Sequence, residues 1–89
     1  MAKIDKQNLK ARAHHLNPVI IIGSKGLTSA VLDETNIALE AHELIKVKIN
    51  GADKDERLSI AKSICDSLKA EFIQQIGNIA ILYREREEV

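Results

Sequence analysis

The sequence predicts one small α/β domain of the α+β kind, with helices packed on a four-stranded mixed sheet. Helix-like and strand-like hydrophobic patterns alternate at short intervals in the order α-β-α-β-α-β-β. The 89 residues fit a single domain spanning residues 1–89, with no internal repeat or long linker. Phe72 and Tyr83 are the only Phe, Tyr or Trp residues, so we expect an aliphatic core.

The N-terminal part is predicted to form a basic helix followed by a strand. Residues 4–14 have a weak helical pattern, which Pro18 ends because the residue before a proline avoids helical dihedral angles. The most regular feature of this helix is a basic stripe made of Lys3, Lys6, Lys10 and His14. Residues 19–22 form a continuous β-branched run, typical of a strand that is buried on both faces in a parallel pair.

The middle of the chain is predicted to form a second helix and an alternating strand. Residues 27–43 follow a helical pattern, and Thr28 is suited to cap it. The expected buried face of this helix consists of Leu27, Ala30, Val31, Ile37, Ala38 and Ala41. Residues 44–49 alternate, with Ile45, Val47 and Ile49 on one face and Lys46 and Lys48 on the other.

The C-terminal part is predicted to form a helix and a β-hairpin. Asp53 and Glu56 have the spacing of a capping box, which starts a helix that runs to about Lys69. Its inward residues are expected to be Leu58, Ala61, Cys65 and Leu68, with Ile60 and Ile64 beside them. Residues 71–76 and 79–84 are predicted strands joined by a two-residue turn at 77–78, and the charged tail 85–89 is expected to fray.

Charge is balanced over the chain and unevenly distributed along it. Thirteen Lys and Arg residues balance thirteen Asp and Glu residues. Residues 1–26 hold five basic side chains and one acidic side chain, whereas residues 27–45 hold four acidic side chains and no Lys or Arg. A neutral chain with opposite halves predicts a molecule with one basic and one acidic side.

Few residues favour an enzyme, a metal site or a membrane protein. Cys65 is the single cysteine and is interpreted as a small buried hydrophobic residue. We interpret His14, His15 and His42 as surface or helix-end residues, so no metal or other cofactor is expected. There is no apolar signal-peptide region and no apolar run of about 20 residues, so a cytoplasmic protein that does not enter membranes is expected.

The segment Gly23-Ser24-Lys25-Gly26 is the main candidate binding site. It is a Gly-x-x-Gly loop between a predicted strand and a predicted helix, and it is neither a P-loop nor a dinucleotide fingerprint. Glycines at both ends let a sugar-phosphate backbone approach the main chain, the helix N-terminus favours an anion, and Lys25 adds a charge. An ordinary strand-to-helix turn is the alternative interpretation of the loop taken alone.

Two further groups of basic residues favour the binding interpretation. The basic stripe directly precedes the same strand, so it is expected to lie near the loop, and Lys46 and Lys48 project from one face of the next strand. If all three groups share one side, they form a basic surface of the kind that binds phosphate backbones. Because base-stacking platforms need exposed aromatic rings, we expect recognition of backbone and shape.

The residues also resemble a known family. The segments LNPVIIIGSKGLTSAVLDETNIALEAHELIKVKI and QQIGNIAILYR resemble the CRM domain (chloroplast RNA splicing and ribosome maturation), and the chain is similar to stand-alone bacterial YhbY-type proteins. The resemblance covers residues 6–84 and implies a fold like the C-terminal domain of bacterial translation initiation factor three. It also implies RNA binding and association with precursors of the large ribosomal subunit.

The resemblance assigns an RNA surface to particular positions. The loop contributes Gly23, Ser24, Lys25 and Gly26, the IKVKI strand contributes Lys46 and Lys48, and the closing LYR contributes Arg84. The N-terminal helix contributes Lys3, Lys6, Lys10 and Arg12, where the alignment is loose.

The leading hypothesis is a non-catalytic protein that binds ribosomal RNA during assembly of the large subunit. A second hypothesis is an interaction domain that docks a basic ribosomal protein through its acidic helix, around Asp33, Glu34, Glu40 and Glu43. An enzyme acting on a phosphorylated metabolite is a third, weaker alternative.

Overall fold

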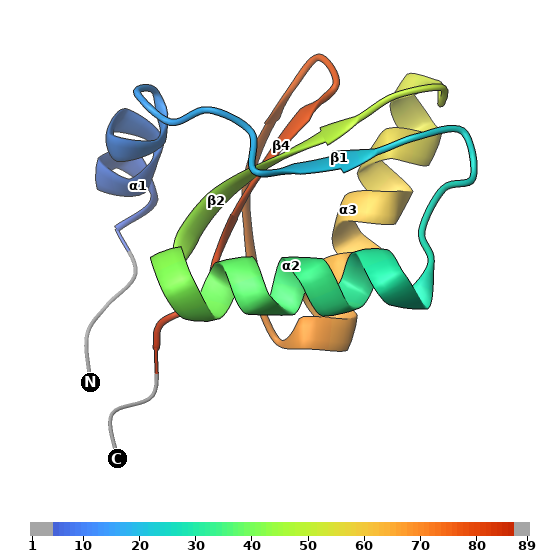
Figure 1. Cartoon of the computed structure of the whole chain (residues 1–89). Coiled ribbons are helices and arrows are strands. Elements are labelled where there is room, and N and C mark those ends of the chain that lie inside the picture. The colour runs from blue at the N-terminus through green and yellow to red at the C-terminus, as the bar shows by residue number, and fades with distance from the viewer. Residues whose placement is uncertain (1–4, 87–89) are drawn as a thin grey trace.

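The computed structural model describes residues 5–86 and has the predicted order of elements (Figure 1). The helices are α1 (Lys6–Ala13), α2 (Ser29–His42) and α3 (Lys54–Leu68). The strands are β1 (Ile20–Ile22), β2 (Leu44–Ile49), β3 (Glu71–Ile76) and β4 (Ile79–Tyr83). Each predicted helix and strand is therefore confirmed, with bounds that shift by one or two residues.

The sheet is mixed and four-stranded, as predicted, and its strand order is β1-β2-β4-β3. β1 and β2 pair in parallel, whereas β4 is antiparallel to both β2 and β3. β3 therefore runs in the direction of β2 while β4 lies between them. α3 connects two strands that are not neighbours, and the final hairpin fills the gap between them.

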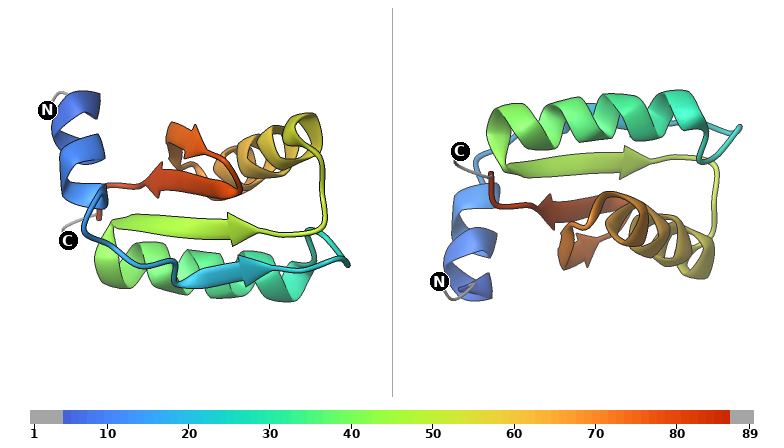
Figure 2. Two further views of the ribbon diagram at one scale, coloured as in Figure 1. Left: turned by 90° about the horizontal axis from the view of Figure 1, so that it is seen from above. Right: turned by 90° about the horizontal axis from the view of Figure 1, so that it is seen from below.

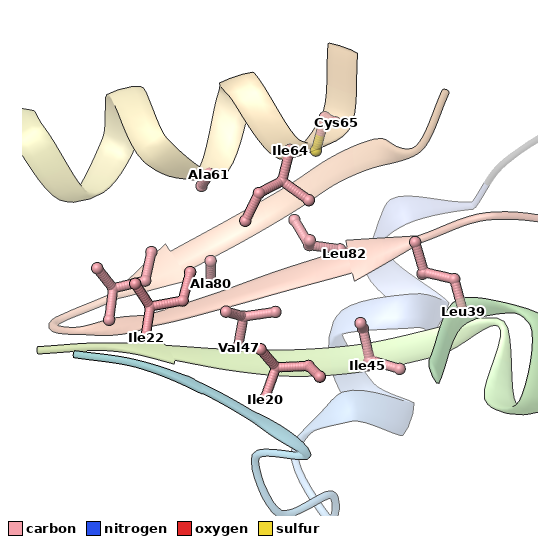
Figure 3. Close-up of a cluster of buried hydrophobic side chains, with 11 residues drawn as sticks. Ile20, Ile22, Leu39, Ile45, Val47, Ala61, Ile64, Cys65, Ala80 and Leu82 are labelled. Atoms are coloured by element: carbon pink, nitrogen blue, oxygen red, sulfur yellow. The ribbon is translucent and has the colours of Figure 1, made fainter. Parts of the chain in front are cut away.

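One face of the sheet is covered by α2 and α3, and this layer holds the main core (Figures 1 and 3). The predicted alternation in β2 directs Ile45, Val47 and Ile49 into this core. Ala61, Ile64 and Cys65 of α3 pack against them, as predicted. The core is aliphatic, with Phe72 packed at its margin.

The other face of the sheet is covered at one end only. Leu9 and Ala13 of α1 pack on Leu44, Ile73 and Ile81. Over the rest of this face no helix formed by residues 5–86 crosses the strands, as the two views in Figure 2 show. We call this part of the sheet the open face.

Local hydrogen bonds explain where the helices begin. Thr28 Oγ1 accepts from the amide of Val31 at 3.2 Å, and Asp53 Oδ1 accepts from the amide of Glu56 at 2.8 Å. Both predicted caps are confirmed, because each side chain binds one first-turn amide that has no partner within the helix.

The predicted buried face of α2 is wrong at several positions. Ala30 and Ala41 are exposed and Ile37 is 67% exposed, whereas Thr35 and Leu39 are buried. The hydroxyl of Thr35 donates to the carbonyl of Val31 at 2.7 Å, so this polar group is satisfied inside the core. The apolar pattern missed Thr35 because its side chain has a hydroxyl in place of a methyl.

The prediction of a first strand buried on both faces is also wrong. β1 is an edge strand, and Ile21 is 64% exposed on the open face while Ile20 and Ile22 point into the core. The β-branched run predicted extended structure correctly. Burial of both faces of β1 would need a helix on the open face as well, and α1 does not extend over β1.

Candidate nucleic-acid interface

The Gly-x-x-Gly loop is a tight turn between β1 and α2. The amide of Gly26 donates to the carbonyl of Gly23 at 3.0 Å, which leaves Ser24 and the exposed Lys25 at its tip. Gly26 has φ of +71°, a left-handed conformation that favours glycine. At Gly23 an added Cβ would meet nothing within 4 Å, so the fold itself does not require glycine there.

The start of α2 adds an electrostatic preference for anions. The helix begins at Ser29, three residues after Gly26, and its first turn contains no acidic residue. The first backbone amides of the helix have no hydrogen-bond acceptor within it, and the helix dipole is positive at this end. Lys25 and the N-terminus of α2 therefore act with the same sign on a phosphate placed at the loop.

Two neighbouring loops hold this turn in place. The amide of Asn50 donates to the carbonyl of Ile22 at 2.8 Å, and an added Cβ at Gly51 would lie 3.5 Å from Ser24 Cα. The amide nitrogen Nδ2 of Asn78, in the hairpin turn, donates to Asn50 Oδ1 at 3.1 Å. The turn of the Gly-x-x-Gly loop is thus packed against the main chain of the β2–α3 loop.

Arg57 of α3 links the β2–α3 loop to the β3–β4 turn. Its Nη1 donates to the carbonyl of Ala52 at 2.6 Å, and its Nε donates to the carbonyl of Gly77 at 3.1 Å. Sequence reasoning missed Arg57 and both asparagines, because no local pattern marks a side chain that binds a distant carbonyl. These side chains hold in place the β2–α3 loop, against which the Gly-x-x-Gly loop packs.

The two strand lysines lie beside this loop on the open face. Lys46 and Lys48 point away from the main core, since their neighbours in β2 point into it. Lys48 pairs with Ile21, two residues before the loop begins. The structure therefore places both strand lysines on the open face, with Lys48 nearer to the loop than Lys46.

The basic N-terminal helix lies at the opposite end of the sheet, so its predicted position near the loop is wrong (Figure 2). α1 packs on Leu44, at the start of β2, whereas the loop leaves β1 beside Ile49, at the end of β2. These positions are separated by five residues, or about 17 Å of extended chain. Lys6 and Arg12 are exposed and Lys10 is half-buried, whereas Lys3 lies outside the described residues.

Arg84 is held inside the protein at the same far end. Its guanidinium donates to the side-chain oxygen and the carbonyl of Asn36 at 2.8 and 3.2 Å and to the carbonyl of Leu68 at 2.9 Å. It also pairs with Glu40 at 3.0 Å, and the side chain of Arg84 is 17% exposed. Arg84 therefore joins α2, α3 and β4, a structural role that sequence reasoning did not find.

Part of the tail that was expected to fray is also bonded. The amide of Arg86 donates to Glu43 Oε2 at 2.7 Å, and its Nη2 donates to the carbonyl of Ala41 at 3.2 Å. Residues 87–89, the remainder of that predicted tail, lie outside the described residues.

The described part of the chain has neither a cluster of metal ligands nor an activated thiol. Between residues 5 and 86, no group of three His, Cys, Asp or Glu side chains is placed to hold a metal ion. Burial, with smaller contributions from Asp66 and Glu71, raises the pKa of Cys65 to about 11, so its thiol stays protonated at neutral pH. No helix in this range is both long enough and apolar enough to cross a membrane.

The fold and the loop together define a class of small α/β domains that present a Gly-x-x-Gly turn at the edge of a mixed sheet. Residues 1–84 match the model of the CRS1/YhbY (CRM) domain, and the chain belongs to this family. The expected family and fold are both confirmed.

Individual relatives extend over most of the chain. An RNA-binding protein of Haemophilus influenzae is 52% identical, and the match covers 93% of this chain and 84% of the relative. A Bacillus subtilis protein whose name proposes RNA binding is 32% identical over 93% of this chain and 86% of its own length. The solution structure of a proposed RNA-binding protein from Staphylococcus aureus has a TM-score of 0.83 at 30% identity, covering 93% and 86% of the two chains.

Proposed function

We propose that this protein binds RNA without catalysing a reaction, through the Gly-x-x-Gly loop and the adjacent part of the open face. The observation that carries the proposal is the exposed Lys25 at the tip of a supported turn, beside a helix N-terminus. Relatives that are named for RNA binding support the choice of ligand. The proposed surface consists of Gly23, Ser24, Lys25, Gly26, Lys46 and Lys48, with Lys6, Lys10 and Arg12 as a second basic region at the far end.

The mechanism is electrostatic docking of a phosphate backbone. The absence of a Cβ at Gly23 opens the main chain to close approach, and no contact within the protein uses that space. Lys25 and the first amides of α2 attract the phosphate, while Lys46 and Lys48 extend the positive surface across the sheet. Arg84 is left out, because its guanidinium already binds four acceptors within the protein.

The RNA we propose is ribosomal RNA in precursors of the large ribosomal subunit. This choice rests on the family to which the chain belongs, and the protein would act in the cytoplasm during subunit assembly. Crosslinking the protein to RNA in cells and sequencing the attached fragments tests it. Enrichment of large-subunit precursor sequence supports the assignment, and enrichment of unrelated transcripts contradicts it.

The loop is tested by charge reversal at Lys25. Lys25→Glu should weaken binding of a structured RNA about tenfold at low salt and lower the slope of log affinity against log salt by about one. Lys62→Glu is the matched control, because Lys62 is exposed on α3, on the covered side of the sheet. Equal affinities for the wild type and Lys25→Glu, measured by fluorescence anisotropy, would contradict the loop assignment.

The exposed side of α2 favours a second candidate function, which is docking of a basic ribosomal protein. Ile37 is 67% exposed on α2, about one turn after the acidic residues Asp33 and Glu34. Glu40 pairs with Arg84 and Glu43 accepts from Arg86, so a partner would be held mainly by the first two carboxylates and Ile37. Reversal of Asp33 and Glu34 to Lys should then abolish co-purification of a basic ribosomal protein while leaving RNA affinity unchanged.

A further inference from the structure

A cavity of about 340 Å³ lies at the end of the molecule that carries α1, and no residue of the Gly-x-x-Gly loop lines it. Three separate parts of the chain surround it: the last turn of α1 with the α1–β1 connection, the last residue of α2, and the start of β2. Its volume is within the range of pockets that take small organic groups.

The path of the α1–β1 connection creates this cavity. The amide of Val19 donates to the carbonyl of Lys46 at 3.1 Å, which is the first contact of this segment with β2. Before Val19 the chain turns away at Pro18, and β1 pairs only with Val47, Lys48 and Ile49. The first residues of β2 therefore have no neighbouring strand on that edge, and the hollow occupies the space.

The cavity has an apolar floor and a mouth lined by both apolar and polar side chains. Leu44 and Ile45 are 4% and 1% exposed, so they form the floor. Five other lining residues are exposed and stand at its mouth: the apolar Leu16 and Val19 and the polar Arg12, Asn17 and His42. An occupant must therefore be a flat or compact group with an apolar surface and polar edges.

Two of the mouth residues carry planar side chains suited to a nucleobase. Unpaired bases of RNA stack on the guanidinium of arginine and on the imidazole of histidine, as well as on larger aromatic rings. Arg12 and His42 supply one plane of each kind, and the amide of Asn17 can donate to and accept from a base edge. The scarcity of Phe, Tyr and Trp therefore does not remove stacking from this protein.

The charge around the cavity matches the same ligand. Arg12 is part of a helix that also carries Lys6 and Lys10, with no acidic residue between positions 6 and 13. A base in the cavity would place its phosphate near Arg12, so one nucleotide would meet both the apolar floor and a positive charge at the mouth.

We propose that this cavity receives one unpaired base of the RNA that the protein binds. The inference rests on the proposed function and adds a second contact, about 13 Å along the sheet from the loop, because Ile45 of the cavity lies four residues before Ile49. It also specifies the class of RNA, which is a duplex or loop interrupted by an extruded nucleotide.

A pair of RNA hairpins tests the proposal. One has a fully paired stem, and the other carries a single bulged 2-aminopurine in an otherwise identical stem. The wild type should bind the bulged hairpin about tenfold more tightly, because stacking of one base contributes roughly that factor. Binding should also change the 2-aminopurine fluorescence.

Variants at the mouth separate this cavity from the loop. His42→Ala and Asn17→Ala should abolish the preference for the bulge and the fluorescence change, with unchanged affinity for the paired hairpin. His15→Ala is the matched control, since His15 is an exposed histidine of the same connection that does not line the cavity. Lys25→Glu should weaken binding of both hairpins equally.

Three outcomes would overturn the proposal. The first is equal affinity of the wild type for the two hairpins, and the second is an unchanged preference in His42→Ala and Asn17→Ala. The third is tight binding of a labelled peptide of alternating Leu and Glu that His42→Ala abolishes, which would assign the cavity to a protein partner. Failure of the proposed function differs from all three, because neither hairpin would then bind at low salt.

Discussion

The two ends of this molecule both carry basic residues, but they present different chemical groups. At the loop end, Lys25 stands on a turn whose main chain is supported by Asn50 and by the neighbouring loops. At the α1 end, Lys6, Lys10 and Arg12 project from a short helix that packs on the sheet through Leu9 and Ala13. One end offers main chain to a phosphate, and the other offers side chains around a cavity.

The comparison teaches that a cluster of charges does not by itself locate a binding site. The sequence contains more basic residues in the N-terminal helix than in the loop, yet it is the loop whose main chain packs against the β2–α3 loop. Arg84 is a second example, because its positive charge pairs with Glu40 within the protein. The position of a charge relative to backbone and partners decides what it can bind.

The largest effect on stability is expected from a substitution that detaches α1 from the sheet. Ala13 is fully buried, and Ala13→Asp would place a carboxylate against Leu44 and Ile81 without a partner. This costs several kcal/mol, on the order of 3, which undocking of the helix can relieve. Thermal unfolding and amide hydrogen exchange of residues 6–13 measure it.

Ala11→Asp is the control for this change, because Ala11 is exposed on the same helix. It should leave the unfolding temperature nearly unchanged. Retention of exchange protection in Ala13→Asp would show that α1 is not held by this contact. The comparison of the two ends would then need a different physical basis.

A smaller effect is expected at Arg84. Arg84→Met should lower the free energy of unfolding by about 2 kcal/mol, because it leaves the part-buried carbonyl of Leu68 and the carbonyl of Asn36 without a charged donor. RNA affinity should stay within about twofold of the wild type, which denaturant unfolding and anisotropy check together. A large loss of affinity with unchanged stability would return Arg84 to the RNA surface.

The two glycines of the loop should respond in opposite ways. Gly26→Ala should destabilise the fold by about 1 kcal/mol, because alanine disfavours the left-handed φ of +71°. Gly23→Ala should leave stability equal or slightly raised, since its Cβ meets nothing within 4 Å, while it weakens RNA binding. Full RNA affinity in Gly23→Ala would contradict close approach of the backbone at this position.

The smallest effect should come from a single charge on α1. Lys10→Glu should lower RNA affinity about threefold, less than Lys25→Glu, since the helix charges act without main-chain donors beside them. As the salt concentration is raised, the loss of affinity in Lys10→Glu should disappear before the loss in Lys25→Glu. A larger loss for Lys10→Glu than for Lys25→Glu would reverse the ranking of the two ends.

Much of the fold could be predicted because its signals are local. The caps at Thr28 and Asp53 and the turn at 77–78 depend on residues within four positions of each other, and all three are present. The buried face of α2 was missed because satisfaction of the Thr35 hydroxyl could not be inferred from a hydrophobic pattern. The exposure of Ile21 depended on where α1 packs, which its weak pattern did not indicate.

The sequence by itself determined the order of the elements, their caps, the Gly-x-x-Gly turn and the family, because short-range hydrogen bonds and side-chain alternation encode them. The tertiary structure alone decided the position of β4 between β2 and β3, the docking of α1 far from the loop and the bonds of Arg84. It also decided the cavity that joins Arg12, Asn17 and His42. These features join residues up to 48 positions apart, and such contacts form only when the whole core packs.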